Sequence, residues 1–248
     1  MAWAGARLFS CGLHGQLVEY DLTSRQERGR TGLTSGPAWC LAVDRDNTRL
    51  AVGTEDGLVC LFNLEGDKVD YDKVLDRQQG RILCLAWHPD SLHIVTGSTD
   101  TVRVWNIETG QPTARMVVGR AEGNNETIVW CVAVTSDMTV ISGDSRGKTS
   151  FWNGTTGTLS ESIQSHKADV LTLALSPDEK TAVSAGVDPT LMHFQTVTRA
   201  GGRRRWVKSL NRVISSHDVR SVVYSQVGIL FKILSLCHKE PAKGKKCP

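Results

Sequence analysis

The sequence lacks a hydrophobic run that could cross a membrane. Its longest late apolar stretch, residues 228–237, is interrupted by Lys232 and falls far short of the roughly 20 residues that a spanning helix needs. The opening residues Met1, Ala2 and Trp3 supply neither the basic region nor the long apolar region of a secretory signal. We therefore expect a soluble, intracellular protein that makes no contact with a membrane.

A strong excess of one charge is also missing. The chain carries 29 basic and 26 acidic residues, a net charge of +3, which does not by itself indicate a nucleic-acid binder. The seven cysteines form no C-x-x-C pair, and the histidines are dispersed without metal-ligand spacing. The sequence therefore predicts no metal site and no cofactor.

The sequence does contain a repeat. Residues 82–110 read as three short strands separated by turn residues, and the same order recurs at residues 38–66, 129–157 and 170–195. Residues 7–22 match the back half of another copy. Two series of residues mark the copies at intervals of about 41 to 47 residues: the glycines Gly12, Gly53, Gly97, Gly143 and Gly186, and the aromatic residues Tyr20, Phe62, Trp105, Trp152 and Phe194.

This period predicts an all-β fold, because units of about 40–45 residues with four strands each are typical of β-propeller blades. We expect an incomplete propeller over residues 1–225, with four complete blades (38–76, 82–120, 129–165 and 170–216) and partial blades at both ends. Cys40, Cys84 and Cys131 recur at one position of the first strand, which predicts core packing. Residues 226–248 depart from the repeat, and their lysines and prolines predict a disordered basic tail.

The segment that follows the last complete copy is basic and contains no acidic residue. Two interpretations remain open: a solvated connection between outer strands, or a patch that binds RNA phosphates or an acidic protein, with the tryptophan stacking on bases. The residues of this predicted patch are Arg199, Arg203, Arg204, Arg205, Trp206 and Lys208.

Two stretches resemble catalytic or phosphate-binding motifs, but the residues around them do not support either motif. Residues 143–147 match G-x-S-x-G around Ser145, but a nucleophile elbow needs a following helix, whereas Thr149, Phe151 and Trp152 continue as a strand. Residues 143–149 are one residue short of a phosphate-binding loop, and no helix pattern follows them. We expect a turn at this position and a protein that is not an enzyme and binds no small-molecule substrate.

The repeats resemble the WD-repeat propeller family. Trp105-Asn106 and Trp152-Asn153 stand at the Trp-Asp ending of that family's blades, and residues 88–90 and 176–178 stand at the first turn. The resemblance implies structural roles within the blades for Asp56, Asp100, Trp105, Trp152, His166 and His217. In the blade of Trp105, Gln78 occupies the position of the histidine.

More narrowly, residues 7–225 resemble the cirhin-like WD-repeat proteins of the nucleolus, which are subunits of the small-subunit processome. The resembling segments include residues 7–22, 52–62, 76–89, 128–134 and 141–159. The resemblance implies a partial chain that covers most of the first of two propellers. It also implies a scaffold that supports pre-rRNA transcription and processing, contacts other processome proteins through its propeller faces and contacts pre-rRNA through the basic segment.

A WD-repeat substrate receptor of a ubiquitin ligase, or another signalling scaffold, is the alternative. Ligase receptors often carry Trp-Asp-x-Arg at a blade end, but Trp105 and Trp152 are followed by Asn-Ile-Glu and Asn-Gly-Thr. Under either function, an open set of blades should leave apolar residues such as Val219, Val222 and Val223 exposed, because no next blade covers them.

Overall fold

The computed structural model describes residues 1–120, 122–198, 204–213 and 218–225. Within these residues, strands form five antiparallel sheets of four strands each. The helical content of this part is one 3-10 turn, Glu122–Asn124. No helix in the described ranges is long and apolar enough to cross a membrane. The predicted all-β fold is confirmed.

Each sheet is one blade, and its four strands follow one another in chain order. The first blade contains β1 (Ala2–Ala4), β2 (Arg7–Gly12), β3 (Gln16–Asp21) and β4 (Gln26–Gly32). The second contains β5 (Ala38–Val43), β6 (Arg49–Thr54), β7 (Val59–Asn63) and β8 (Asp70–Val74). The third contains β9 (Cys84–Trp87), β10 (His93–Gly97), β11 (Thr101–Asn106) and β12 (Pro112–Val117).

The last two blades repeat this order. The fourth contains β13 (Val129–Val134), β14 (Thr139–Asp144), β15 (Lys148–Asn153) and β16 (Thr158–Gln164). The fifth contains β17 (Val170–Leu175), β18 (Thr181–Gly186), β19 (Thr190–Thr198) and β20 (Arg204–Val213). The expectation of a partial first blade is wrong, because Ala2–Ala4 pairs with β2 and supplies the fourth strand.

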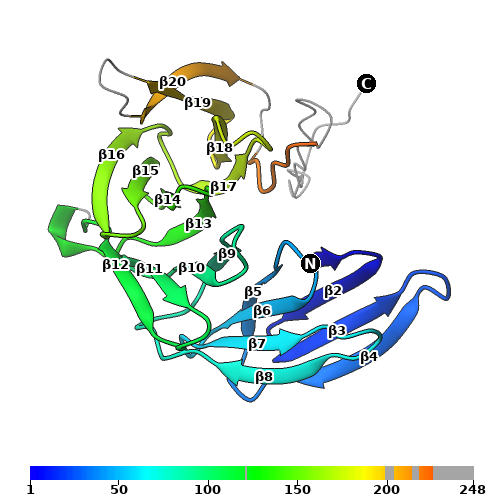
Figure 1. Cartoon of the computed structure of the whole chain (residues 1–248). Coiled ribbons are helices and arrows are strands. Elements are labelled where there is room, and N and C mark those ends of the chain that lie inside the picture. The colour runs from blue at the N-terminus through cyan, green and yellow to red at the C-terminus, as the bar shows by residue number, and fades with distance from the viewer. Residues whose placement is uncertain (121, 199–203, 214–217, 226–248) are drawn as a thin grey trace, which may run out of the picture.

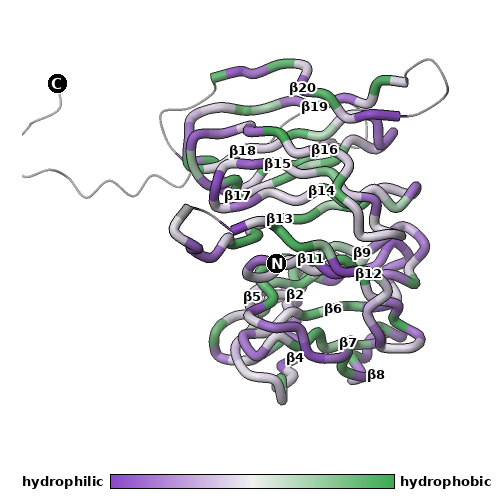
Figure 2. Tube along the Cα trace, turned by 90° about the vertical axis from the view of Figure 1, so that its left-hand side faces the viewer, coloured by the Kyte–Doolittle hydropathy of each residue, from purple (hydrophilic) through white to green (hydrophobic). Residues whose placement is uncertain are grey.

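The blades are arranged side by side around an open arc (Figure 1). The first strands of successive blades contact one another in chain order, from β1 through β5, β9 and β13 to β17. A view turned by 90° shows the fifth blade at the top and strands of the first and second blades together at the bottom (Figure 2). This arrangement leaves the first and fifth blades at the two ends of the described part of the chain.

The core lies between neighbouring blades. Phe9 and Leu17 of the first blade pack against Leu50 and Phe62 of the second, and comparable clusters join each following pair of blades. The middle strands are covered on both faces, which explains why they are almost continuously apolar while the outer strands are polar. Trp105 and Trp152 lie in the third strands of their blades and are buried, as the repeat predicts.

The recurring glycines stand at the ends of second strands, and three of them, Gly53, Gly97 and Gly143, touch the next blade there. A Cβ on Gly97 would lie 2.4 Å from Cys84 Sγ and 2.8 Å from Val129 Cγ1. The Cys84 thiol donates in turn to the carbonyl oxygen of Val129, at 3.5 Å. Gly53 with Cys40, and Gly143 with Cys131, repeat this contact in the neighbouring blades.

The three recurring thiols therefore pack at the joints between blades, as the sequence predicts. Burial raises the pKa of Cys40, Cys84 and Cys131 above the ordinary thiol value, because it penalises the charged form. Each thiol stays protonated and serves as a small packing group with one weak hydrogen bond.

Residues 218–225 lie against the fifth blade rather than in solvent. Val219 and Val222 are buried in a cluster with Val183 and Leu191, and Val219 N–H donates to Gly186 O at 2.8 Å. The expectation that both valines are exposed is wrong, because they cover the face of the fifth blade themselves. Val223 points away and is exposed, as expected. The predicted tail, residues 226–248, lies outside the described residues.

Candidate functional site

A buried chain of hydrogen bonds surrounds Trp105. Its indole Nε1–H donates to Thr96 Oγ1 at 2.8 Å, and the Thr96 hydroxyl donates to Gln78 Oε1 at 2.6 Å. Gln78 Nε2 then donates to Thr101 Oγ1 at 3.2 Å. Gln78 therefore occupies the position expected for a histidine and links β10 to β11, which is a structural role.

The fifth blade uses histidine for the same purpose. His166 Nδ1 lies 2.7 Å from Asp188 Oδ1, and His166 Nε2 lies 2.7 Å from Ser184 Oγ. Burial opposes ionisation of Asp188, but bonds from Lys167 N–H and His166 outweigh it, and the pKa of Asp188 is lowered. Sequence reasoning missed Asp188 because it stands two residues after the strand-end glycine, not three as in Asp56 and Asp100. His217 lies outside the described residues.

The two aspartates that sequence analysis selected have different contacts. Asp100 accepts the main-chain N–H of Thr127 at 2.7 Å and the Arg120 guanidinium at 2.8 Å, so it connects a hairpin turn to the chain entering the next blade. Asp56 contacts Arg77 through its main-chain oxygen at 2.8 Å. Trp152 donates to Ser142 Oγ at 2.9 Å, which parallels the bond of Trp105 in the preceding blade.

Ser145 lies in the turn between β14 and β15, where its Oγ accepts the main-chain N–H of Ile128 at 3.0 Å. The neighbouring Asp144 carboxylate accepts the N–H groups of Arg146 and Lys148. Both side chains hold the turn, and β15 continues the sheet where a nucleophile elbow would require a helix.

The predicted basic segment is an outer strand, β20, and its charges are partly paired. Arg205 forms an ion pair with Glu161, and Arg204 lies 4.0 Å from Asp137. Trp206 is buried and stacks on Phe151, with ring centroids 5.1 Å apart and planes 14° apart. The expectation that Trp206 stacks on bases is therefore wrong. Lys208 is exposed, and Arg199 and Arg203 lie outside the described residues.

Sequence analysis did not select a further open surface that the structure shows. A hollow of about 680 Å³ lies where the second, third and fourth blades meet, with Trp39 and Trp130 in its lining. Both tryptophans occupy the same position, one residue before the recurring cysteine of the first strand. This shared position could have indicated the hollow from the sequence, because Leu83 occupies the same position in the third blade and also lines the hollow.

The tryptophans of the hollow are held by charged neighbours. Trp39 is 41% exposed, donates to Glu55 at 2.5 Å and has the Arg81 guanidinium 5.6 Å from its ring centroid. Trp130 donates to Asp169 at 2.9 Å. The hollow therefore combines fixed aromatic surfaces with charges of both signs, a composition that suits a protein partner.

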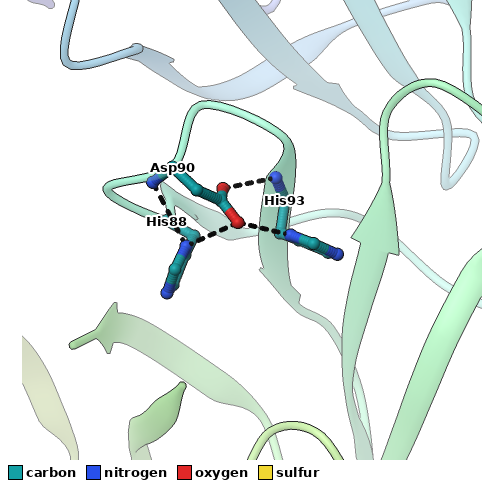
Figure 3. A group of neighbouring side chains, drawn as sticks. All are labelled: His88, Asp90 and His93. Atoms are coloured by element: carbon teal, nitrogen blue, oxygen red, sulfur yellow. Dashed lines mark hydrogen bonds and ion pairs between the residues drawn. The ribbon is translucent and has the colours of Figure 1, made fainter. Parts of the chain in front are cut away.

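A second cluster lies in the turn between β9 and β10. His88, Asp90 and His93 each point a potential ligand atom to a common place, and these atoms lie within 4.8 Å of one another (Figure 3). Asp90 Oδ2 is 3.0 Å from His88 Nδ1 and 2.7 Å from His93 Nδ1. The expectation that no histidines share metal-ligand spacing is therefore wrong, because the hairpin brings together residues that the sequence separates by a turn.

Comparisons with known proteins agree with the repeat. The family described as WD domain, G-beta repeat matches residues 29–63, 72–106 and 157–195. The human U3 small nucleolar RNA-associated protein 4 homolog is 38% identical over 236 residues, which cover 93% of this chain and 34% of that protein. U3 small nucleolar RNA-associated protein 4 of Saccharomyces cerevisiae is 32% identical, over 92% of this chain and 30% of its own length.

A solved structure shows the same fold. A chain of the crystal structure of the mitotic checkpoint complex superposes with a TM-score of 0.74 at 19% identity, over 93% of this chain and 68% of its own length. The present chain spans about a third of the length of the curated relatives named above. The repeat, the five four-stranded blades and these similarities together show a β-propeller fold with WD-type repeats, and 93% of this chain is similar to part of the human U3 small nucleolar RNA-associated protein 4 homolog.

Proposed function

We propose that this chain is a non-enzymatic scaffold of ribosome biogenesis that acts in the nucleolus with other proteins of the small-subunit processome. The observation that carries the proposal is the 38% identity, over 93% of this chain, to a protein named for its association with U3 small nucleolar RNA. The blade architecture supports it, because the polar residues of the described blades are engaged in holding turns and strands together.

Partner proteins would dock in the hollow around Trp39 and Trp130. Accessible tryptophans that are held by hydrogen bonds, such as the exposed Trp39 and the partly exposed Trp130, lose little side-chain freedom on binding, and such residues supply much of the binding energy at protein interfaces. Glu55 and Asp169 hold the two indole N–H groups in this way. The strand β20 is the weaker candidate, because Arg205 is paired with Glu161 and Trp206 is buried.

Affinity purification from cells tests the proposal. The chain should co-purify processome proteins and U3 small nucleolar RNA, and immunolocalisation should show it in the nucleolus. Trp39→Ala should reduce the recovered partners, since it removes an exposed anchor of the hollow. Trp3→Ala is the matched control, because Trp3 is 55% exposed on the first blade, outside the hollow.

One result would contradict the proposed function, and another would contradict only the proposed docking surface. A diffuse cytosolic signal together with recovery of ubiquitin-ligase subunits would favour the substrate-receptor function instead. Equal recovery of processome partners by the Trp39 variant, the Trp3 variant and the parent chain would leave the scaffold function in place but exclude the hollow as its docking surface.

A further inference from the structure

The turn between β9 and β10 is held rigidly. His88 N–H donates to His93 O at 2.9 Å, and Ser91 N–H donates to His88 O at 3.0 Å. These bonds place His88, directly after β9, opposite His93, the first residue of β10, with ring centroids 6.0 Å apart. Asp90 Oδ1 accepts the N–H groups of Leu92 and His93, at 2.7 and 3.0 Å, which fixes the carboxylate between the rings.

His88 Nδ1 lies between a donor and an acceptor. This nitrogen lies 3.2 Å from Asp90 N–H, a donor, and 3.0 Å from Asp90 Oδ2, an acceptor. An unprotonated Nδ1 accepts from Asp90 N–H but turns its lone pair towards a carboxylate oxygen that repels it. A proton or a cation on Nδ1 removes this repulsion, and either one takes the lone pair that the Asp90 N–H would otherwise use.

Two charged side chains of the second blade lie next to the turn. Asp46 of the second blade adds a further negative charge next to the turn, since the Ser91 hydroxyl donates to it at 3.4 Å. Arg49 is the neighbouring positive charge, and its guanidinium is directed at Ser91 O at 3.4 Å.

The turn itself does not need imidazoles. In the fifth blade the corresponding residues are Ser176, Asp178 and Thr181, and the turn closes through Ser176 Oγ–H to Asp178 Oδ1 at 2.5 Å and Thr181 N–H to Ser176 Oγ at 3.0 Å. Hydroxyl groups therefore suffice to close this turn in the same fold. The two histidines of the third blade are additional to what the turn requires, and both aim Nδ1 at the same carboxylate oxygen (Figure 3).

We propose that His88, Asp90 and His93 form a binding site for one zinc ion, with a fourth position open to solvent. Two imidazoles and one carboxylate are ligands that zinc accepts at about 2.0–2.2 Å, which corresponds to ligand atoms about 3.3 Å apart in a tetrahedron. The present Nδ1–Oδ2 separations of 3.0 and 2.7 Å would open by about 0.3 and 0.6 Å, and the two Nδ1 atoms, which lie within 4.8 Å of one another, would have to stand about 3.3 Å apart. Imidazole nitrogen favours zinc over magnesium or calcium, which prefer oxygen.

Zinc titration of the tag-free, EDTA-treated full chain tests the site. Calorimetry and metal analysis should find one zinc ion that His93→Gln and Asp90→Asn both remove. Outer-shell partners alone change metal affinity by about 10–100-fold, so loss of a direct ligand should weaken binding at least tenfold. Asp90→Asn keeps an oxygen that can accept from Leu92 and His93, so this variant should fold.

His14→Gln is the control, because His14 is exposed in the turn between β2 and β3 and should leave zinc binding unchanged. Zinc should also raise the melting temperature of the parent chain and of this control, but not of the two ligand variants. Cobalt in place of zinc should give no thiolate charge-transfer band, which separates this site from the cysteines. Unchanged zinc affinity in both ligand variants, or no zinc bound by the parent chain, would overturn the proposal.

Discussion

Replacing Gly97 by alanine should destabilise the array of blades at one joint. The new Cβ would lie 2.4 Å from Cys84 Sγ and 2.8 Å from Val129 Cγ1, distances at which the neighbouring atoms must move. Both neighbours belong to innermost β strands that are each held by a ladder to the second strand of their blade, which limits how far they can move away. Overpacking of this kind costs about 1–3 kcal/mol, or roughly 2–12 °C in melting temperature for a domain of this size.

Thermal unfolding followed by circular dichroism measures this change. Gly12→Ala is the matched control, since Gly12 ends the second strand of the first blade and its Cβ would meet nothing within 4 Å. Adding Cys84→Ala to Gly97→Ala should recover part of the loss, because it removes the closer of the two clashing atoms, and the pair should therefore be non-additive. Equal melting temperatures for the Gly97 and Gly12 variants would refute the reasoning.

Three further outcomes are expected. Trp105→Phe removes the Nε1–H that donates to Thr96, and urea denaturation should show a loss of about 1–3 kcal/mol because the buried hydroxyl then has one partner fewer; a change below about 0.5 kcal/mol would contradict this role. Because the pKa of Asp90 is lowered to about 2, its contribution to stability is complete above the unfolded value of about 3.9 and is lost as the pH falls towards 2. The contribution is on the order of 1 kcal/mol after screening at the surface. Asp90→Asn should therefore make the free energy of unfolding depend less on pH at acid pH; an unchanged pH dependence would exclude this contribution of Asp90. Replacing Arg204 and Lys208 by Glu should leave RNA association and its salt dependence unchanged, whereas a salt slope that falls by about one for each residue would restore the RNA interpretation of the basic strand.

Much of the fold could be predicted from the sequence because propeller blades are local structures. Each blade is a run of consecutive strands joined by short turns, so the spacing of glycines and aromatic residues along the chain already indicates the number and order of the sheets. The burial of Trp105 and Trp152 and the packing of the recurring cysteines follow from the same periodicity. The first blade was misjudged because a strand of three residues, Ala2–Ala4, is too short to show a pattern.

The surfaces could not be predicted in the same way, because they depend on contacts between segments that the sequence separates. Trp206 is not available for stacking on bases because it stacks on Phe151 of the fourth blade. Arg205 is not a free positive charge because it is paired with Glu161, also of the fourth blade. The exposure of Val219 and Val222 was decided by the apolar face of the fifth blade, which these residues cover.

The sequence by itself determined the repeat: its period, the all-β class and the residues that face the joints between blades. Only the tertiary structure decided which side chains meet. It placed Trp39 and Trp130 around one hollow and turned His88 and His93 towards Asp90. The physical reason is that strand periodicity fixes the face on which a side chain lies, whereas its neighbours are set by pairing across hairpins and by packing between blades.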